Sequence, residues 1–391
     1  MNSRPLLLTA LSITGLVLAA CGDGTGPGQA EPEFKTVVAG DDHACLIGPD
    51  ARAHCWGLNV LGQLGDGDSA DRLIPTPVSG HHRFRELTAG SAHTCGLTED
   101  GTAWCWGSNA LGALGDGSPS TRSQVPVLVA TSLRFQTLAA GTGYTCGVAM
   151  DGSGWCWGSG GNGELGNGDT ADYRVPSAVA GGLRFKAITT GLFHTCALTT
   201  GGQAYCWGDN QYGKMGTGNL QNSLVPQPVS GNLVFKAIDA GDFHTCALAG
   251  DGQAYCWGSN VSFELGIGSD LTTFTTEPTP VAGHLVFNAF SVGSSHACGV
   301  TPRGDMYCWG ASTYGKLGRG SETATLSPVL VSGGHDFIAA AAGFNHTCGV
   351  TRGEGAFCWG WNRLGQLGTG NRSGSQVPVR VADLDIVPPV P

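Results

Sequence analysis

Charged residues are scarce in this chain of 391 residues. They make up 13% of it, and 20 Lys and Arg against 30 Asp and Glu give a net charge of −10. No run of basic residues interrupts this balance. Nucleic acid and anionic lipid headgroups are therefore poor partners, because both require a concentrated positive surface.

Catalytic and phosphate-binding motifs are also missing. The chain has no G-x-S-x-G, no H-E-x-x-H, no Walker loop and no isolated Cys/His arrangement outside its repeats. We therefore expect no active site, no catalytic residue, no cofactor and no metal ion, and a role other than catalysis.

Glycine, by contrast, is abundant. It occupies 65 positions, and the chain also holds 10 Trp and 15 Cys. Collagen would need glycine at every third position, and a disordered chain would have fewer aromatic and more charged residues. This composition is typical of a folded protein built from turns and short strands.

The first residues have the pattern of an export signal. Residues 1–20 carry one positive charge at Arg4 and an apolar stretch that ends at Ala20. The stretch is shorter than the roughly 20 residues that a membrane span needs. Its end, Leu-Ala-Ala-Cys, resembles the lipobox of bacterial lipoproteins, which implies lipidation of Cys21. An ordinary cleavage site and a transmembrane anchor are the alternatives.

Residues 21–33 follow the predicted signal peptide and are rich in Gly, Pro and acidic residues. They contain no large apolar side chain, so we expect a flexible tether that begins at the lipidated Cys21. The protein is then an exported, membrane-anchored lipoprotein of the cell envelope or cell surface, and we expect it to be monomeric.

From residue 34 onward the chain repeats itself about every 50 residues. One copy contains strand-like segments at 245–248 and 253–257 around a Gly-Asp-Gly turn. A neighbouring copy adds a Pro-flanked apolar run at 225–229 and a further strand at 233–238. About four short strands per copy, with no helical periodicity, predict the blade of a β-propeller. The Trp-Gly pairs that mark the seven copies begin at Trp56, Trp106, Trp157, Trp207, Trp257, Trp309 and Trp359.

The repeat motif resembles that of a known family. The pattern Gly-x-x-His-Thr-x-Ala-Leu, then Asp-Gly, Tyr-x-Trp-Gly-x-Asn and Gly-x-Leu-Gly, is similar to the repeats of the RCC1 (regulator of chromosome condensation) family. The resemblance implies an all-β, seven-bladed β-propeller over residues 34–387, followed by a tail at 388–391. How the ring closes is left open. Single copies depart from the pattern at Tyr144, Gly160, Phe263 and Ser312.

The cysteines follow the repeat. If the hairpin turn has three residues, Cys246 and Cys256 lie directly opposite each other on neighbouring strands, within reach of a disulfide. We therefore predict one cross-strand disulfide per blade, as the oxidising exported compartment allows. Zinc binding, with His194 joining the cysteines, and free buried thiols are the alternatives. The fourteen paired cysteines, each ten positions from its partner, are Cys45 and Cys55, Cys95 and Cys105, Cys146 and Cys156, Cys196 and Cys206, Cys246 and Cys256, Cys298 and Cys308, and Cys348 and Cys358.

Other recurring residues are predicted to be structural. The same histidine recurs in six copies, whereas a catalytic site is usually one asymmetric cluster. The Trp-Gly tryptophans are expected to fill the wedges between blades. Asp66 and Asp68 lie in an acidic turn that could hold calcium, although the full ligand spacing is missing. The six histidines, for which we expect hydrogen-bonded structural roles, are His43, His93, His194, His244, His296 and His346.

A rigid frame with variable loops suits recognition of a partner. We therefore expect a scaffold that binds a protein or a surface polymer of unknown identity. The alternative is an extracellular hydrolase or lyase, which a strongly perturbed carboxylate or histidine in one blade only would favour. Guanine-nucleotide exchange, the activity of the family's namesake, is disfavoured because export removes the nuclear GTPase. The candidate partner contacts break the repeat or lie in variable loops: Phe263, Phe274 within 269–280, Asp66, Asp68 and Arg72.

Overall fold

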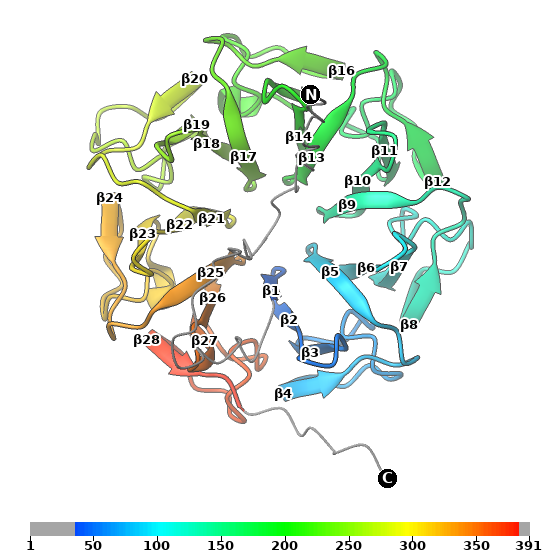
Figure 1. The fold of residues 1–391 in the computed structure, drawn as a ribbon, viewed down its shortest axis with the longest axis horizontal. Helices are drawn as coiled ribbons and strands as arrows, with labels where there is room; N and C mark the ends of the chain where they lie inside the picture. The colour runs from blue at the N-terminus through cyan, green and yellow to red at the C-terminus, as the bar shows by residue number, and fades with distance from the viewer. Residues whose placement is uncertain (1–35, 383–391) are drawn as a thin grey trace, which may run out of the picture.

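Seven four-stranded antiparallel sheets form a ring in the computed structural model, which describes residues 36–382 (Figure 1). Each sheet is one sequence repeat, with its four strands in chain order. The expectation of an all-β, seven-bladed propeller is thus confirmed. The predicted signal peptide, the tether with Cys21, and the tail at 388–391 lie outside the described residues.

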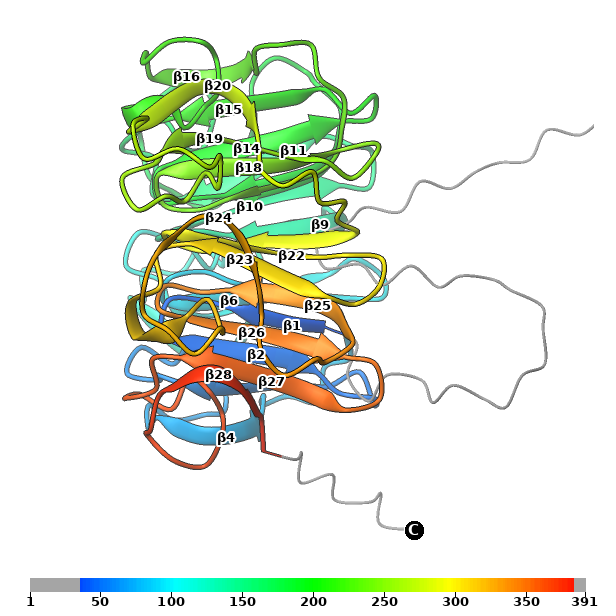
Figure 2. The same ribbon diagram turned by 90° about the vertical axis from the view of Figure 1, so that its left-hand side faces the viewer.

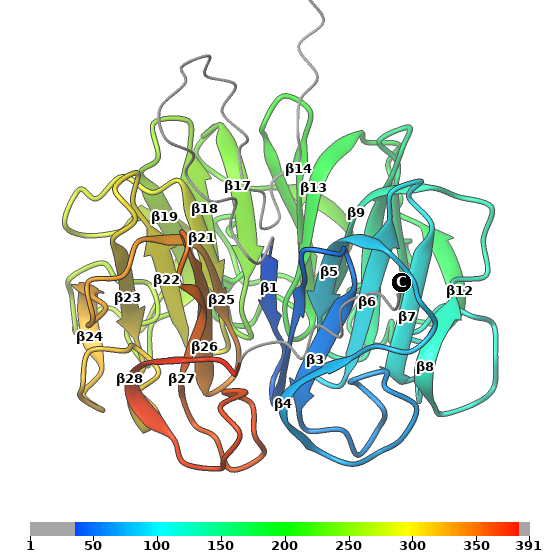
Figure 3. The ribbon, with the colours of Figure 1, turned by 60° about the horizontal axis from the view of Figure 1, so that its bottom comes forward.

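The strands of every blade run between the two faces of a thick disc (Figure 2, Figure 3). The innermost strands are β1 (Thr36–Ala39), β5 (Phe84–Ala89), β9 (Phe135–Ala140), β13 (Phe185–Thr190), β17 (Phe235–Ala240), β21 (Ala289–Val292) and β25 (Phe337–Ala342). The second strands are β2 (His43–Ile47), β6 (His93–Thr98), β10 (Tyr144–Ala149), β14 (His194–Thr199), β18 (His244–Ala249), β22 (His296–Val300) and β26 (His346–Thr351).

The third strands are β3 (Ala53–Gly57), β7 (Ala103–Ser108), β11 (Gly154–Gly158), β15 (Ala204–Gly208), β19 (Ala254–Ser259), β23 (Met306–Gly310) and β27 (Gly355–Gly360). The outer strands are β4 (Arg72–Pro77), β8 (Arg122–Leu128), β12 (Tyr173–Ala178), β16 (Ser223–Pro228), β20 (Phe274–Pro280), β24 (Thr325–Leu330) and β28 (Ser375–Arg380). Two short helical turns, η1 (Gln211–Gly213) and η2 (Thr313–Gly315), complete the fold. No helix within residues 36–382 is long and apolar enough to cross a bilayer.

The ring closes without exchange of a strand among the described residues, because the first and last blades each hold four consecutive strands. The two blades meet through side chains instead. Trp56 Nε1 donates to the carbonyl of Gln366 at 2.9 Å, and Arg372 lies 3.4 Å from Asp71. The other six junctions each contain a tryptophan hydrogen bond equivalent to that of Trp56, so the closing junction is built like the rest.

Each blade contains the predicted disulfide between its second and third strands. Cys246 pairs directly with Cys256 in the strand register, and the other six pairs occupy equivalent positions. Their Cα atoms are 4.0 to 4.1 Å apart. All fourteen cysteines are fully buried among the hydrophobic residues of the blades. Because the sulfur atoms bond one another, they are not zinc ligands.

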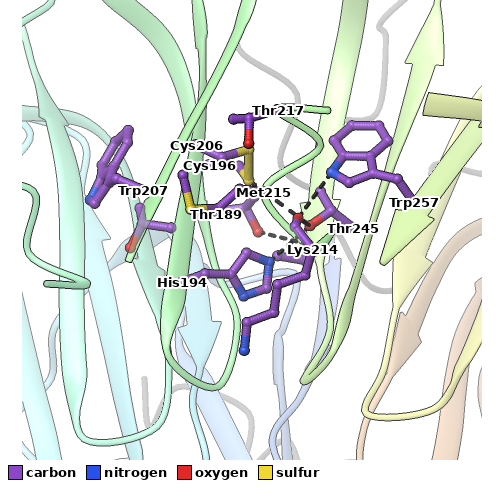
Figure 4. The surroundings of a disulfide bond; sticks show 12 residues. Thr189, His194, Cys196, Cys206, Trp207, Lys214, Met215, Thr217, Thr245 and Trp257 are labelled. Atoms are coloured by element: carbon purple, nitrogen blue, oxygen red, sulfur yellow. Dashed lines mark hydrogen bonds between the residues drawn. A yellow bond between two sulfur atoms is a disulfide. The ribbon is translucent and has the colours of Figure 1, made fainter. Parts of the chain in front are cut away.

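Neighbouring blades are joined by a repeated set of hydrogen bonds (Figure 4). Trp257 Nε1 and Thr245 Oγ1 both donate to the carbonyl of Lys214, at 2.9 Å each. The same threonine oxygen lies 2.8 Å from His194 Nε2. Because the threonine hydroxyl donates its hydrogen bond to the carbonyl, His194 Nε2 must donate to the threonine oxygen. The neutral histidine is therefore the tautomer protonated at Nε2.

This arrangement confirms the structural role of four histidines, His43, His93, His194 and His296, each bonded to a threonine of the next blade. The seven Trp-Gly tryptophans are fully buried at the junctions, which confirms their predicted place.

Two histidines depart from the expectation. His244 and His346 are equally buried, but neither ring nitrogen of either residue has a hydrogen-bond partner within residues 36–382. The reason is local, because the next blade presents Ala297 or Ala44 where the other blades have threonine. At the remaining junction Tyr144 replaces histidine, and its hydroxyl donates to the carbonyl of His194 at 2.6 Å.

Candidate interaction face

The two faces of the disc differ in what they carry. His43 pairs with Gly57, so the turn before β2 and the loop after β3 lie on one side, which we call the loop face. The hairpin turns between second and third strands lie on the other side, the hairpin face. Thr36 pairs with Ile47 beside such a turn, so the described chain begins at the hairpin face.

At the centre of the loop face, seven turns approach one another around a cavity of about 80 Å³, which we call the channel mouth. Each turn begins with a glycine. A Cβ on Gly40 would collide with the carbonyl oxygen of Gly90 in the next blade and with the His43 ring, and the other six glycines are similarly confined. Only glycine allows the blades to converge this closely. The seven are Gly40, Gly90, Gly141, Gly191, Gly241, Gly293 and Gly343.

Acidic side chains lie at the channel mouth. Asp41 and Asp242 both line the cavity. Burial raises the pKa of Asp41 to about 6, against a lowering hydrogen bond from Ser91, and repulsion from Asp242 and Asp42 raises it further. Burial also raises the pKa of Asp42. No lysine, arginine or histidine is among the described residues that line this cavity.

Aromatic side chains gather on the loop face over blades 4 to 7, counted in chain order from β1, which together hold the strands β13 to β28. Tyr314 and Phe344 are the most open, at 44% and 41% exposure. Tyr212 packs edge-on against Phe243 at 5.9 Å between ring centroids, and Tyr314 lies 6.0 Å from Trp361. We call this set the aromatic crescent: Phe193, Tyr212, Phe243, Tyr314, Phe344 and Trp361.

The crescent is confined to one part of the ring. The two residues after the turn glycine in blades 1 to 3 are Asp41 and Asp42, Ser91 and Ala92, and Thr142 and Gly143. The residue directly after the Trp-Gly pair, which is Trp361 in blade 7, is likewise aliphatic or polar in those blades, as Leu58, Ser108 and Ser159. Because repetition alone would place the same residues in every blade, this asymmetry marks a specialised surface rather than the frame.

Strained backbone accompanies the crescent. Tyr212, Phe263 and Tyr314, in blades 4, 5 and 6, have φ values of 63°, 65° and 63°. Bulky residues rarely adopt this left-handed conformation, and such outliers cluster at functional sites. At the Phe263 position the other blades have glycine. A Cβ on Gly62, for example, would lie 2.7 Å from the Ser123 carbonyl of the next blade.

Two buried lysines lie beneath the crescent. Lys214 Nζ contacts Asp209 at 2.8 Å and lies over the rings of Phe193 and Phe243, at 5.9 and 5.2 Å from their centroids. Lys316 Nζ donates to the Phe344 carbonyl at 3.0 Å, and burial lowers the pKa of Lys316 to about 8. These contacts hold the turns that carry the aromatic rings.

The blade 1 residues predicted to contact a partner serve the loop itself. Arg72 pairs with Asp66 at 2.5 Å and with Asp68 at 2.6 Å. The side chain of Asp66 is 2% exposed and also accepts a hydrogen bond from Asn59. A guanidinium therefore already neutralises the acidic turn proposed for calcium. No group of three or more potential metal-ligating side chains occurs within residues 36–382.

The predicted blade 5 contacts lie beside the crescent. Phe274 opens β20 opposite Ser259, at the loop-face end of the blade, and is 39% exposed. Phe263 is partly buried in the loop before it. The structure thus places Phe263 and Phe274 on one blade at the loop face, separate from the Asp66 loop of blade 1.

Sequence reasoning missed the crescent and the acids of the channel mouth. The available signal was the turn Gly-x-x-His, in which the second or third residue is aromatic only in blades 4, 5 and 7, as Phe193, Phe243 and Phe344. In a single repeat these look like ordinary variation. Their significance emerges when the ring brings the turns together.

A closed ring of wedges with similar sequences, one face of which differs between blades, defines a repeat-built β-propeller of seven blades. The family models then identify the repeats, and the chain belongs to the regulator of chromosome condensation (RCC1) repeat family. One model matches residues 50–97, 100–148, 151–198, 201–248, 303–350 and 355–389. A second matches residues 34–63, 84–113, 185–214, 235–263, 287–316 and 337–366.

Solved structures share the fold at low sequence identity. Human WBSCR16 is similar at a TM-score of 0.76 and 18% identity, over 85% of this chain and 94% of that one. Prp20p from Saccharomyces cerevisiae gives 0.77 and 22%, over 91% and 87%. Yeast RCC1 (Prp20) bound to Kap60 gives 0.77 and 19%, over 96% and 92%. A comparison with curated proteins found no match.

Proposed function

We propose that this protein is an exported, lipid-anchored propeller that binds another protein through its loop face and performs no catalysis. The observation that carries the proposal is the aromatic crescent, a partly exposed and asymmetric set of rings on an otherwise repeated frame. Aromatic residues are enriched at the centres of protein interfaces, where they bury a large area. The yeast structures, which involve Gsp1p, histones and Kap60, are consistent with protein binding.

The position of the first strand supports the same proposal. The described chain begins on the hairpin face, so a tether anchored at Cys21 would approach from the side opposite the crescent. The 15 residues from Cys21 to Lys35 would reach at most about 50 Å when fully extended. In this arrangement the loop face points away from the membrane and is accessible to a partner.

The extracellular hydrolase or lyase is the second candidate, because Asp41 is a carboxylate with a raised pKa that lines the channel mouth. Its cavity of about 80 Å³ is small beside the roughly 300 to 1,000 Å³ of typical ligand sites. The buried Asp239, whose pKa burial also raises to about 6, accepts hydrogen bonds from Thr189 and from the backbone of Val292. That carboxylate joins the inner strands of three blades and has a structural use.

Comparative cross-linking tests the proposed binding. Cells would carry the wild-type protein, a crescent variant (Tyr314→Ser, Phe344→Ser, Trp361→Ser) or a rim variant (Val125→Ser, Val175→Ser, Val377→Ser). The rim residues are exposed apolar side chains of outer strands, so they control for loss of apolar surface. We expect the wild type and the rim variant to cross-link the same protein and the crescent variant to lose it. Equal cross-linking by all three would reject the loop face as the binding surface.

A separate experiment tests the anchor. A Cys21→Ser variant should fail to incorporate a labelled fatty acid and should leave the membrane fraction, while the wild type incorporates the label and stays. Incorporation of label into the variant, or its continued sedimentation with membranes, would contradict lipidation at Cys21.

A further inference from the structure

The crescent and the channel mouth are parts of one surface. The turns that line the mouth also carry crescent residues: Phe243 follows Asp242 directly, and Phe344 follows the lining glycine Gly343. A partner that covers Phe243 and Phe344 therefore also covers the mouth. The chemistry of the partner must suit both the aromatic crescent and the groups that line the channel mouth.

The centre favours a positive charge. Asp41, Asp42 and Asp242 form no ion pair with any residue between 36 and 382. Asp242 accepts a hydrogen bond from Ser294 at 2.5 Å and Asp41 accepts one from Ser91, so neither carboxylate is paired directly with a cation. Lys214 and Lys316 both act on Asp242 from nearby, but the Lys214 ammonium is paired with Asp209 and the Lys316 ammonium is committed to Ser295 and to the Phe344 carbonyl.

The size of the mouth limits what can enter it. A volume of about 80 Å³ holds only a few groups the size of water, which takes about 30 Å³ in the liquid. An ammonium or guanidinium head is small enough to enter this space, whereas a folded segment is not. The remainder of any partner must rest outside, on the crescent.

We propose that the protein partner presents one lysine or arginine within an apolar surround, with the cationic head in the channel mouth between Asp41 and Asp242 and the apolar surround on the aromatic crescent. This inference rests on the proposed function and specifies its partner. The partner's charge complements the acidic mouth, and burial of the pair beneath apolar contacts strengthens the attraction relative to water.

The test uses short random peptides displayed on phage, selected against the purified protein and then titrated as synthetic peptides. The panel contains the wild type, the crescent and rim variants, and a mouth variant (Asp41→Asn, Asp242→Asn) of nearly unchanged shape. We expect selected peptides to carry a basic residue among apolar ones. The mouth and crescent variants should each weaken their binding by about tenfold or more, and the rim variant should not.

A second measurement avoids any dependence on how the variants fold. Replacing the basic residue of a selected peptide by norleucine should weaken its binding to the wild type by a similar factor. Peptides without a basic residue that bind the crescent, and that the mouth variant binds equally well, would overturn this inference but leave the proposed function intact. Selected peptides that the crescent variant binds normally would count against both. Failure to select any peptide, together with crescent-dependent binding of an envelope oligosaccharide, would replace the protein partner by a polymer.

Discussion

At the scale of single residues, the junctions show how one hydroxyl determines whether a buried histidine is satisfied. His194 donates a hydrogen bond to the Thr245 hydroxyl, which in turn donates one to the Lys214 carbonyl. His244 meets Ala297 instead and has no partner at either nitrogen among the described residues. A buried polar group without a partner costs about 1 to 3 kcal/mol, so the junction of blades 5 and 6 is weaker by an amount of this order.

Ala297→Thr should therefore stabilise the protein. The new hydroxyl can accept from His244 and donate to the Glu264 carbonyl, which already accepts a hydrogen bond from Trp309. We expect the free energy of unfolding in urea to rise by about 1 kcal/mol. The Ala297→Val variant is the matched control, because it adds similar volume without the hydroxyl. A gain of the same size in both variants would show that packing, and not the hydrogen bond, is responsible.

The reciprocal change removes a bond that exists. Thr245→Ala leaves His194 buried without its acceptor and should lower the free energy of unfolding by about 1 to 3 kcal/mol. The measurement is the same urea titration. Thr245→Ser, which keeps the hydroxyl, should recover most of the loss. If serine fared no better than alanine, the threonine would act through its methyl group.

At the scale of elements, the disulfide binds two adjacent strands that already share a ladder. Cys246 and Cys256 are fully buried and directly opposed, so the disulfide links two strands that are already hydrogen-bonded to each other. Its stabilisation comes mainly from the unfolded state, where it closes a short loop. Because the blades are equivalent, a single pair can be removed without altering the architecture.

Replacing one pair, with Cys246→Ala and Cys256→Ala, should lower the free energy of unfolding by about 2 to 3 kcal/mol. The circular dichroism spectrum of the folded protein and its binding to the partner should remain unchanged. The measurement is equilibrium unfolding in urea without reductant. As a check on burial, dithiothreitol should release few thiols from the folded wild type and all of them in urea. Full release from the folded protein would contradict the burial of the sulfurs.

Much of each blade could be predicted from the sequence, because the signals are local. The segment 245–248 corresponds to β18 (His244–Ala249) and 253–257 to β19 (Ala254–Ser259), with the cysteine spacing fixing their register. The innermost strand was predicted at 233–238 but forms at Phe235–Ala240. The connection before it turns at Asn232, which has a φ of 53°, so Leu233 belongs to the turn.

At the scale of the whole molecule, the candidate site could be predicted only in part. Departure from the repeat pointed to Phe263 and Phe274, which do lie at the loop face of blade 5. It also pointed to Arg72, which pairs with acids of its own loop. The crescent and the channel mouth depend on blades far apart in sequence, and ring closure sets which of their turns meet.

Six of the seven blades each hold one buried histidine at a blade junction. These histidines determine how the free energy of unfolding responds to acid. Burial lowers the pKa of His43 to about 3 and of His93 and His346 to about 4, from an ordinary 6.5, and lowers those of His194, His244 and His296 as well. Between pH 6.5 and 4 these histidines take up protons only when the chain unfolds. Each therefore lowers the free energy of unfolding as the pH falls, by up to about 1.4 kcal/mol per pH unit.

Four acids oppose this trend. Burial raises the pKa of Asp41 and Asp239 to about 6 from an ordinary 3.8, and it also raises the pKa values of Asp42 and Glu164, so protonation of these groups by acid favours the fold. Six fully buried histidines outnumber these four carboxylates, and we expect the free energy of unfolding to fall from pH 6.5 to 4.5. Urea titrations at several pH values measure this slope. His93→Gln, whose amide can still donate to Thr145, should make the slope shallower. Equal stability at pH 4.5 and 7 would mean that the histidines are not held neutral at the blade junctions.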